Sequence, residues 1–341
     1  MVRRVIAKML GRTGTTNALL SVRRHAPSPW LTILTYHRAA TPTPDDPFDD
    51  GVIDVTPAMF EAHLAFLKEW CSVLRIDDLA SFCAGRPLPP NPVLITFDDG
   101  YLDNYETVYP LLTKYGLSAV FFVATSYIEE RKLFWWDRVN YVMKQSKKDF
   151  IELEVPKPLL LDLRDEKRSN SIRKCLRIVK DHFDLDLPRF LDDLARATGV
   201  NLSPEEERRM VNELLMNWDQ VRALQSGGME VQSHTVTHRV LQTLPQEKLD
   251  FELRHSRAVL GEVLGRPIEA VSYPVGKSLH LTPHIRRAVK AAGYDFGFSN
   301  STGINHVWSF DPINARRLSL EVDLPYSLFR AMMAVPYVSY R

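Results

Sequence analysis

The sequence is poor in three features that would each define a protein class: cysteine, net charge and long apolar runs. Its 341 residues include only Cys71, Cys83 and Cys175, which are widely spaced and form no Cys-x-x-Cys pair. This excludes a disulfide framework and indicates either a reducing compartment or simply buried thiols. The 43 Lys and Arg residues balance 42 Asp and Glu residues, so we expect no nucleic-acid partner. No stretch approaches the roughly 18 apolar residues of a membrane-spanning helix.

What remains is the composition of an ordinary globular chain, with 45% hydrophobic and 25% charged residues. We expect residues 1–30 to form a basic N-terminal extension, in which Val5-Ile6-Ala7 is too short for a signal-peptide core. Two interpretations of this extension stand: a segment that only packs against the domain, or a basic amphipathic segment that rests on an anionic membrane face. We therefore expect a cytoplasmic protein, peripheral on the inner face of the membrane in the second case.

The chain is organised around Val93-Leu94-Ile95-Thr96-Phe97, which runs directly into Asp98, Asp99 and Gly100. A short run of β-branched and aromatic residues bounded by Pro92 and Gly100 predicts a buried strand. Two neighbouring carboxylates at the end of such a strand lose hydration and repel each other, which a metal ion would relieve. Taken alone, however, they are explained more simply by an ordinary polar turn.

A second stretch favours the metal ion. Met229 to Gln232 has the pattern of a short strand, and Ser233-His234-Thr235-Val236-Thr237-His238 follows it. Two histidines four residues apart share a face if the segment turns helically, so both imidazoles can reach one ion. A lone His-x-x-x-His is a weak signal, but here the carboxylates and the histidines both directly follow a predicted strand. Two imidazoles and one carboxylate, with positions left for water, are typical of a catalytic metal site.

Thr96–Gly100 and Ser233–His238 together resemble the first two motifs of the polysaccharide deacetylases, carbohydrate esterase family 4 with the NodB-homology fold. The resemblance runs from about Leu31 to about Leu320, with one long interruption. It implies that Asp98 is the general base and that Asp99, His234 and His238 bind one divalent metal ion. Zinc is the expected metal, and nickel, cobalt and iron also suit two nitrogen ligands and one oxygen ligand.

His37 directly follows the first predicted strand, Leu31–Tyr36. A histidine at such a turn can be purely structural. However, the chain resembles a subset of the family, typified by poly-N-acetylglucosamine deacetylases, that opens with a strand ending in Tyr-His. In that subset the barrel is circularly permuted, and the leading histidine replaces the general acid that other members carry in a C-terminal Leu-x-His motif. The last predicted strand here, 316–320, has no such motif, so the resemblance implies that His37 is the general acid.

The predicted strand 270–273 and the turn after it resemble the family's third motif, one wall of the active site, whose common form is Arg-Pro-Pro-Tyr-Gly. The resemblance implies that the substrate- or oxyanion-binding positions are Tyr273, Pro274, Val275 and Gly276. Ser272 stands where that motif has the arginine that holds the catalytic base. Arg317 is a candidate replacement for the base-orienting arginine, and a surface salt-bridge arginine is the alternative.

Strands and helices alternate along most of the chain, which predicts a parallel sheet with crossover helices. Seven or eight strands can be counted, and we expect residues 31–341 to form a distorted (β/α)7-8 barrel, as the resemblance also implies. In such barrels chemistry lies at the carboxyl ends of the strands. All the candidate residues named above, except Arg317, directly follow predicted strands or end one.

The segment between the two metal motifs is longer than a strand–helix–strand connection needs. We expect residues 134–216 to be a mostly helical insert beside the barrel mouth, with a hairpin formed by 151–155 and 159–163. Phe134-Trp135-Trp136 stands at its start. These aromatic residues are either a platform for a sugar ring or an anchor for the core of the insert.

The expected function is a metal-dependent hydrolase that removes N-acetyl groups from an N-acetylated amino-sugar polysaccharide or glycan precursor and releases acetate, as in exopolysaccharide biosynthesis. Three alternatives stay open. The chain can be an O-acetyl esterase or another amide hydrolase on the same fold. It can also be a non-catalytic carbohydrate-binding barrel, or a structural membrane-surface protein that uses the basic extension and has no need of the metal ligands.

Overall fold

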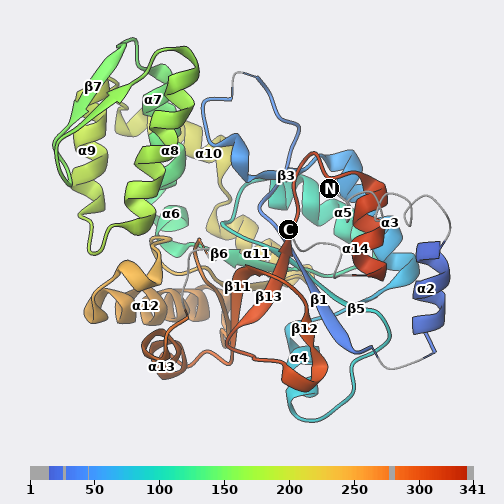
Figure 1. The fold of residues 1–341 in the computed structure, drawn as a ribbon. Helices are drawn as coiled ribbons and strands as arrows, with labels where there is room; N and C mark the ends of the chain where they lie inside the picture. The colour runs from blue at the N-terminus through green and yellow to red at the C-terminus, as the bar shows by residue number, and fades with distance from the viewer. Residues whose placement is uncertain (1–14, 26–27, 45, 276–280, 336–341) are drawn as a thin grey trace.

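Seven parallel strands close into a barrel at the centre of the molecule (Figure 1). The computed structural model describes residues 15–25, 28–44, 46–275 and 281–335. The barrel strands are β1 (Trp30–Tyr36), β5 (Pro92–Phe97), β6 (Val120–Val123), β9 (Glu230–Ser233), β10 (Ala270–Ser272), β11 (Phe296–Thr302) and β13 (Ala315–Ser319). They follow one another in the order β1-β13-β11-β10-β9-β6-β5, and β5 pairs back with β1. The predicted distorted (β/α) barrel is confirmed, with seven strands.

The pairing of β1 with β5 determines which strand ends meet. Thr32 lies opposite Val93 and Tyr36 opposite Phe97, in parallel register. The amide of Asp98 continues this ladder and donates to the carbonyl of Tyr36 over 2.9 Å. The residues that follow the two strands are therefore neighbours at the carboxyl end of the barrel.

Alternating side chains of the strands separate the core into an interior and an outer layer. Leu94 and Phe122 belong to a buried cluster that also holds Leu79 of α4 (Ile76–Cys83). Phe97 and Phe121 belong to a second cluster, which the surrounding helices cover. Because successive strand residues point to opposite faces, the first cluster fills the barrel, and α4 closes it at the end away from the site (Figure 1).

Helices and short strands surround the barrel. The helices are α2 (Thr15–Arg23), α3 (Pro57–Trp70), α5 (Tyr109–Tyr115), α6 (Thr125–Glu130), α11 (Trp218–Ser226), α12 (Gln246–Leu264), α13 (Pro283–Ala291) and α14 (Tyr326–Ala334). Single turns lie at η1 (Asp50–Val52), η2 (Asn104–Val108), η3 (Leu241–Thr243) and η4 (Val307–Ser309). The short strands are β2 (Arg38–Ala39), β3 (Ile53–Val55), β4 (Ser72–Val73) and β12 (Asn305–His306).

The segment predicted as an insert forms a lobe with its own core beside the barrel (Figure 1). Its elements are α7 (Trp135–Gln145), β7 (Phe150–Leu153), β8 (Leu159–Asp162), α8 (Asp165–Asp181), α9 (Leu187–Thr198) and α10 (Pro204–Leu214). Strands β7 and β8 pair antiparallel, as the predicted hairpin requires. The boundaries 31–341 for the barrel domain and 134–216 for the insert stay predictions. The separate core of the lobe supports them.

Most of the predicted basic extension, including residues 1–14, lies outside the described residues. Its described helix, α2, is attached to the domain, since Arg23 donates to the carbonyls of Met333 and Ala334 over 3.1 and 3.2 Å. Among the described residues, no helix combines the length and apolar character needed to cross a membrane. A membrane contact of residues 1–30 stays a prediction.

Candidate active site

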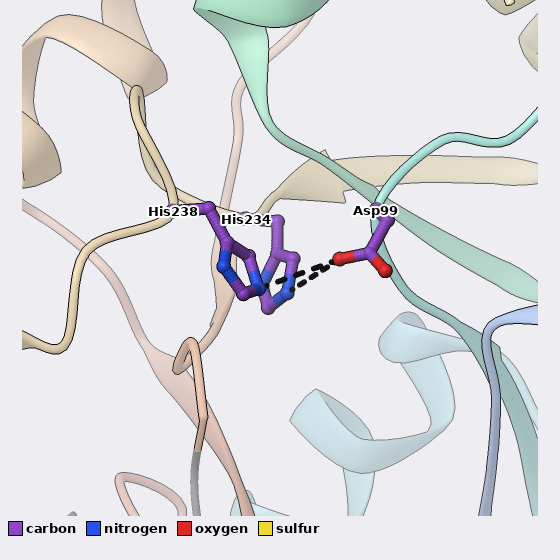
Figure 2. Close-up of side chains that lie close together, drawn as sticks. All are labelled: Asp99, His234 and His238. Carbon is purple, nitrogen blue, oxygen red and sulfur yellow. Dashed lines mark ion pairs between the residues drawn. The ribbon is translucent and has the colours of Figure 1, made fainter. Parts of the chain in front are cut away.

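Three side chains converge at the carboxyl end of the barrel, as Figure 2 shows. Asp99 follows β5, and His234 and His238 follow β9. The Nε2 atoms of both imidazoles lie 3.4 Å from Asp99 Oδ1, and all three side chains are buried. The predicted helical turn is absent: residues 234–238 are a loop in which Thr235 and His238 have φ values of 67° and 53°. This loop, rather than one helix face, brings the two imidazoles together.

The donor set fits one divalent cation. Asp99 Oδ1 is buried and has no hydrogen-bond partner among the described residues, a costly state that a cation would relieve. His234 Nδ1 lies 2.8 Å from the carbonyl of Ser272; by donating there it leaves Nε2 free as a ligand, the usual arrangement for metal-binding histidine. Burial, with a smaller effect of His234, lowers the pKa of His238 to about 3. The His238 imidazole is therefore available in the neutral form that binds metal.

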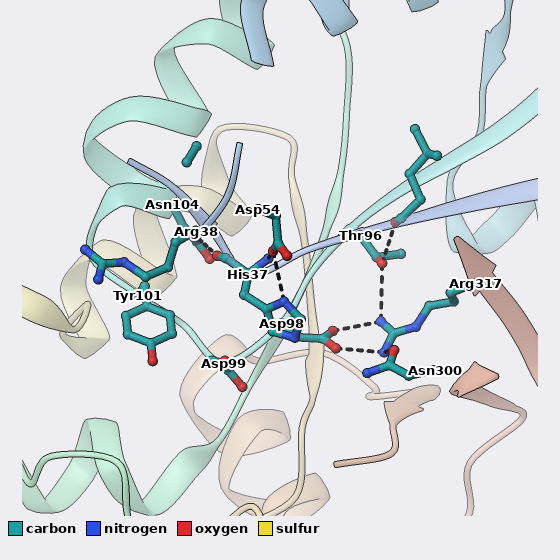
Figure 3. A network of polar contacts seen from close by, with 12 residues as sticks. His37, Arg38, Asp54, Thr96, Asp98, Asp99, Tyr101, Asn104, Asn300 and Arg317 are labelled. Atoms are coloured by element: carbon teal, nitrogen blue, oxygen red, sulfur yellow. Dashed lines mark hydrogen bonds and ion pairs between the residues drawn. The ribbon is translucent and has the colours of Figure 1, made fainter. Parts of the chain in front are cut away.

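The neighbouring carboxylate, Asp98, is fully buried, and both of its oxygens accept hydrogen bonds (Figure 3). Arg317 holds it in a bidentate pair, with Nη1 2.8 Å from Oδ1 and Nη2 2.7 Å from Oδ2. The Ser272 hydroxyl donates to the same Oδ2 over 3.2 Å. Burial by itself would raise the pKa of Asp98, but the Arg317 guanidinium outweighs it and holds that pKa below its usual range. Asp98 therefore stays ionised.

Arg317 reaches this position because β13 is the neighbour of β1 in the barrel. Its side chain is 0% exposed, so the alternative of a surface salt-bridge arginine is wrong. Further contacts fix the guanidinium: Nη2 donates to Ser272 Oγ over 2.8 Å and to Asn300 Oδ1, and Nη1 lies 3.3 Å from Thr96 Oγ1. Ser272, at the position of the motif arginine, is therefore a partner of the arginine that β13 supplies.

His37 follows β1 at the same end of the barrel and is held by Asp54, in β3 (Figure 3). Asp54 Oδ2 accepts hydrogen bonds from the His37 backbone amide and, over 2.9 Å, from Nδ1. Burial lowers the pKa of His37, but the Asp54 carboxylate outweighs burial and raises it to about 10. Asp54 was missed in the sequence. The one signal for it is a carboxylate in the centre of the apolar triplet Ile53-Asp54-Val55.

Comparisons with known proteins agree with this geometry. A sequence model described as polysaccharide deacetylase matches residues 85–154 and 195–297, just over half of the chain. The chain belongs to the polysaccharide deacetylase family. The gap between the two matched ranges falls within the predicted insert.

Solved structures share the fold of this deacetylase. The Streptococcus pyogenes deacetylase PplD, solved in complex with acetate, aligns with a TM-score of 0.58 at 19% identity, over 90% of this chain and 99% of PplD. IcaB from Ammonifex degensii aligns with a TM-score of 0.55 at 17% identity, over 90% of this chain and 98% of IcaB. The Bacillus subtilis protein YxkH, named as a candidate polysaccharide deacetylase, is 36% identical over 95 residues, which are 27% of this chain and 31% of YxkH. The match thus spans less than a third of that curated relative.

The third wall of the deacetylase site is only partly as expected. The side chain of Tyr273 is 0% exposed, and its hydroxyl donates to the carbonyl of Ile313 over 2.8 Å. A substrate contact of the Tyr273 side chain is therefore wrong, because this tyrosine belongs to the core. Pro274 is buried as well. Val275 has a φ of 53° and lines the cavity, as do His37 and Asn300. Gly276 lies outside the described residues.

Trp135 and Trp136 form the wall that the insert contributes. Both are buried; Trp136 stacks on Phe134 with ring centroids 4.3 Å apart and lies 4.4 Å from the ring of His238. Trp135 donates from Nε1 to the carbonyl of His238 over 3.3 Å. The core-anchor interpretation of these aromatic residues therefore holds for their packing. They also line the small cavity, about 140 Å³, that contains the three convergent side chains and His37.

A buried carboxylate joins this wall to the rest of the site. Asp137 Oδ1 accepts from the amide of Asp49 over 2.9 Å, and Oδ2 accepts from the hydroxyl of Tyr101 over 3.0 Å. Tyr101 in turn accepts from Trp136 Nε1 over 2.8 Å. Burial raises the pKa of Asp137 to about 8. The network positions the insert against the loop that carries Asp49, and no pattern of residues predicts it.

Proposed function

We propose that this deacetylase removes N-acetyl groups from an amino-sugar polysaccharide or glycan precursor and releases acetate. One observation carries the proposal: a carboxylate that faces two imidazoles and an Asp-held histidine line one small cavity. The arginine-paired carboxylate Asp98 lies beside this set, with its Oδ2 3.9 Å from His234 Nε2. Together these groups supply metal ligands, a base and an acid, which hydrolysis of an amide requires. The acetate in the PplD complex, described for that protein, supports the same chemistry.

Asp99, His234 and His238 are the proposed ligands of one divalent ion, with zinc as the first choice and nickel, cobalt or iron as alternatives. When bound, such an ion supplies Lewis-acid activation of water and stabilises negative charge on the amide oxygen. The protein prepares for this by keeping both Nε2 atoms and one carboxylate oxygen turned towards a common point.

Asp98 is the proposed general base. Its carboxylate lies 3.9 Å from His234 Nε2, is ionised, and is fixed by Arg317 and Ser272. A base that is already oriented need not be ordered during the reaction. It accepts the proton of the attacking water, and Arg317 is proposed to keep it in place.

His37 is the proposed general acid, and it lines the cavity with Asp99. The Asp54 carboxylate accepts from Nδ1, which leaves Nε2 as the atom that gives a proton to the departing amine. The raised pKa keeps this imidazole protonated at neutral pH. The backbone N–H of Val275, at the edge of the cavity, is the proposed donor to the developing oxyanion.

The test is acetate release from N-acetylglucosamine oligomers by the metal-loaded protein, with Asp98→Asn and His37→Ala variants measured beside it. We expect release by the wild type and a loss of at least about 100-fold in each variant. Release of acetate from O-acetylated but not N-acetylated oligomers would replace the proposal with an esterase. A protein that binds oligomers and releases no acetate would be a carbohydrate-binding barrel.

A further inference from the structure

Lys180, near the C-terminus of α8, lies in the wall of the catalytic cavity. It comes from the insert, and it lines the same cavity of about 140 Å³ as Asp99, His234 and His238. No step of the proposed reaction uses this lysine. A half-buried ammonium in a catalytic cavity has lost part of its hydration, so its presence there needs a reason.

Among the described residues, Lys180 makes no hydrogen bond and has no carboxylate within 4 Å, in contrast to other basic residues of this lobe. Lys144 donates to the carbonyl of Asp46 over 2.9 Å and also to that of Phe48. Arg168 donates to the carbonyls of Met143 and Ser146. Those two side chains hold loops together, whereas the ammonium of Lys180 keeps its donors free.

The acidic groups near Lys180 do not use those donors. Asp49 lines the same cavity and attracts the ammonium, and Asp181 is its neighbour on α8. Asp49 Oδ1 instead accepts from the amide of Gly51 over 3.0 Å. The C-terminal end of α8 favours a positive charge, so Lys180 stays a cation although burial lowers its pKa.

The surface next to the cavity on this side carries charges of both signs. A cleft of about 680 Å³ shares Asp49 with the catalytic cavity, and its lining includes the carboxylates Asp46, Asp49 and Asp50 and the cations Lys144, Arg168 and Arg173. A glycan that extends from the cavity into this cleft would pass these cations. Of the cations that line the cleft and the cavity, Lys180 is the nearest to the reacting group, because it lines the catalytic cavity itself.

We propose that Lys180 is a specificity-determining residue that binds an anionic oxygen of the substrate. The preferred substrate class is then an acidic amino-sugar glycan, with a carboxylate or phosphate group next to the N-acetylated sugar. An ammonium is a compact charge with no planar preference, so both anions suit it. The proposal rests on the proposed N-deacetylase function.

The test compares three metal-loaded assays with different oligomers. The probes are a tetrasaccharide of alternating glucuronate and N-acetylglucosamine, a phosphodiester-linked N-acetylglucosamine oligomer, and neutral N-acetylglucosamine tetramer. A charge-assisted contact is worth about a tenfold difference or more. We expect the KM of the wild type to be lower by that factor for one or both acidic probes, and the preferred probe identifies the anion.

Lys180→Gln should raise the KM for the preferred acidic probe about tenfold more than the KM for the neutral tetramer. Lys180→Arg should restore most of the preference, and high salt should weaken it. Lys174→Gln is the matched control, because Lys174 lies on α8 but is exposed and lines no part of the catalytic cavity.

Failure of this inference is distinguishable from failure of the proposed function. Equal KM values for acidic and neutral probes, or a Lys180→Gln variant that keeps the preference, would overturn the role of Lys180 while acetate release upholds the deacetylase. If no probe is deacetylated, calorimetry still decides: the acidic probes should bind Asp98→Asn protein at least about tenfold more tightly than Asp98→Asn/Lys180→Gln protein. Equal affinities would reject the inference.

Discussion

Asp98 and Asp99 are adjacent in the sequence and equally buried, yet their surroundings are opposite. Asp98 accepts hydrogen bonds from the two terminal nitrogens of Arg317 and from the Ser272 hydroxyl. Asp99 has an oxygen without a hydrogen-bond partner and faces two imidazole nitrogens. Asp99 also has a φ of 78°, so the chain turns sharply there and the two side chains leave β5 in different directions.

The charged and hydrogen-bonding partners of a buried carboxylate, and not its burial, decide its chemistry. A buried acid with a fixed counter-charge stays ionised and is ready to take a proton. A buried acid with an unsatisfied oxygen and neutral imidazoles opposite it is suited to a cation instead. From these contacts we propose that the same dipeptide supplies both a base and a ligand.

Substitution of each carboxylate in turn should have the largest effects and should separate the two roles. We expect Asp99→Asn to lose the metal and essentially all activity. Asp98→Asn should retain the metal and lose at least about 1000-fold in kcat, at the upper part of the range for a general base. Metal content per chain and acetate release are the measurements. Loss of the metal from Asp98→Asn protein, or a full metal content in Asp99→Asn protein, would contradict the separate roles of the two carboxylates.

Removal of Arg317 should make Asp98 resemble an ordinary buried acid. We expect Arg317→Gln to lower the free energy of unfolding by about 3–5 kcal/mol, because a buried charge is left without its partner. Without the guanidinium, burial raises the pKa of Asp98, so the acidic limb of the kcat profile should move to higher pH. Denaturant unfolding and pH–rate profiles are the measurements.

Arg316→Gln is the control for this change, since Arg316 is the exposed neighbour on the same strand. It should leave both quantities unchanged. An acidic limb that does not move in Arg317→Gln protein would show that Arg317 does not hold the base.

Loss of Asp54 should act on the opposite limb of the profile. His37 works as an acid only while it is protonated, and Asp54 raises its pKa. In Asp54→Asn protein that pKa falls, so the alkaline limb should move to lower pH and kcat at pH 8 should fall about tenfold. Asp50→Asn, in the same loop, is the control. A shift of the acidic limb instead would assign Asp54 to the base side.

Asp137 is a third buried carboxylate, and unlike Asp98 it keeps its proton at neutral pH. Because burial raises its pKa to about 8, the folded state binds more protons than the unfolded state between pH 4 and 8, and stability should fall as the pH rises through this window. Asp137→Asn should flatten that slope and reduce activity by only about two- to threefold, since an amide keeps one acceptor for Asp49 or Tyr101. Denaturant unfolding at a series of pH values tests this. An unchanged slope would contradict the assignment.

The metal ligands could be chosen from the sequence, but their geometry could not. The spacing of His234 and His238 suggested a helix face, whereas the structure has a loop whose amides at Val236 and Thr237 donate to Glu252 over 2.8 and 2.9 Å. Glu252 comes from α12, so a distant helix shapes the loop. Local spacing contains no information about such a partner.

Arg317 and Asp54 show the same limit. From the sequence, Arg317 could be either a base-orienting arginine or a surface salt-bridge arginine. Its place beside Asp98 depends on which strands become neighbours when the barrel closes. Asp54 was missed because strand β3 is three residues long. Tyr273 failed for a different reason: a motif position gives the location of the backbone, while packing against Ile313 decided where the side chain points.

The pairing of β1 with β13 has a consequence for biosynthesis. The two strands are neighbours in the barrel and yet are the first and last barrel strands to leave the ribosome. Asp98 is synthesised long before Arg317, and burying its charge without that arginine is unfavourable. The growing chain therefore gains nothing by closing around β5 early. Completion of the active site and final closure of the barrel become one event, so a chain that ends before β13 has neither a closed barrel nor a complete site.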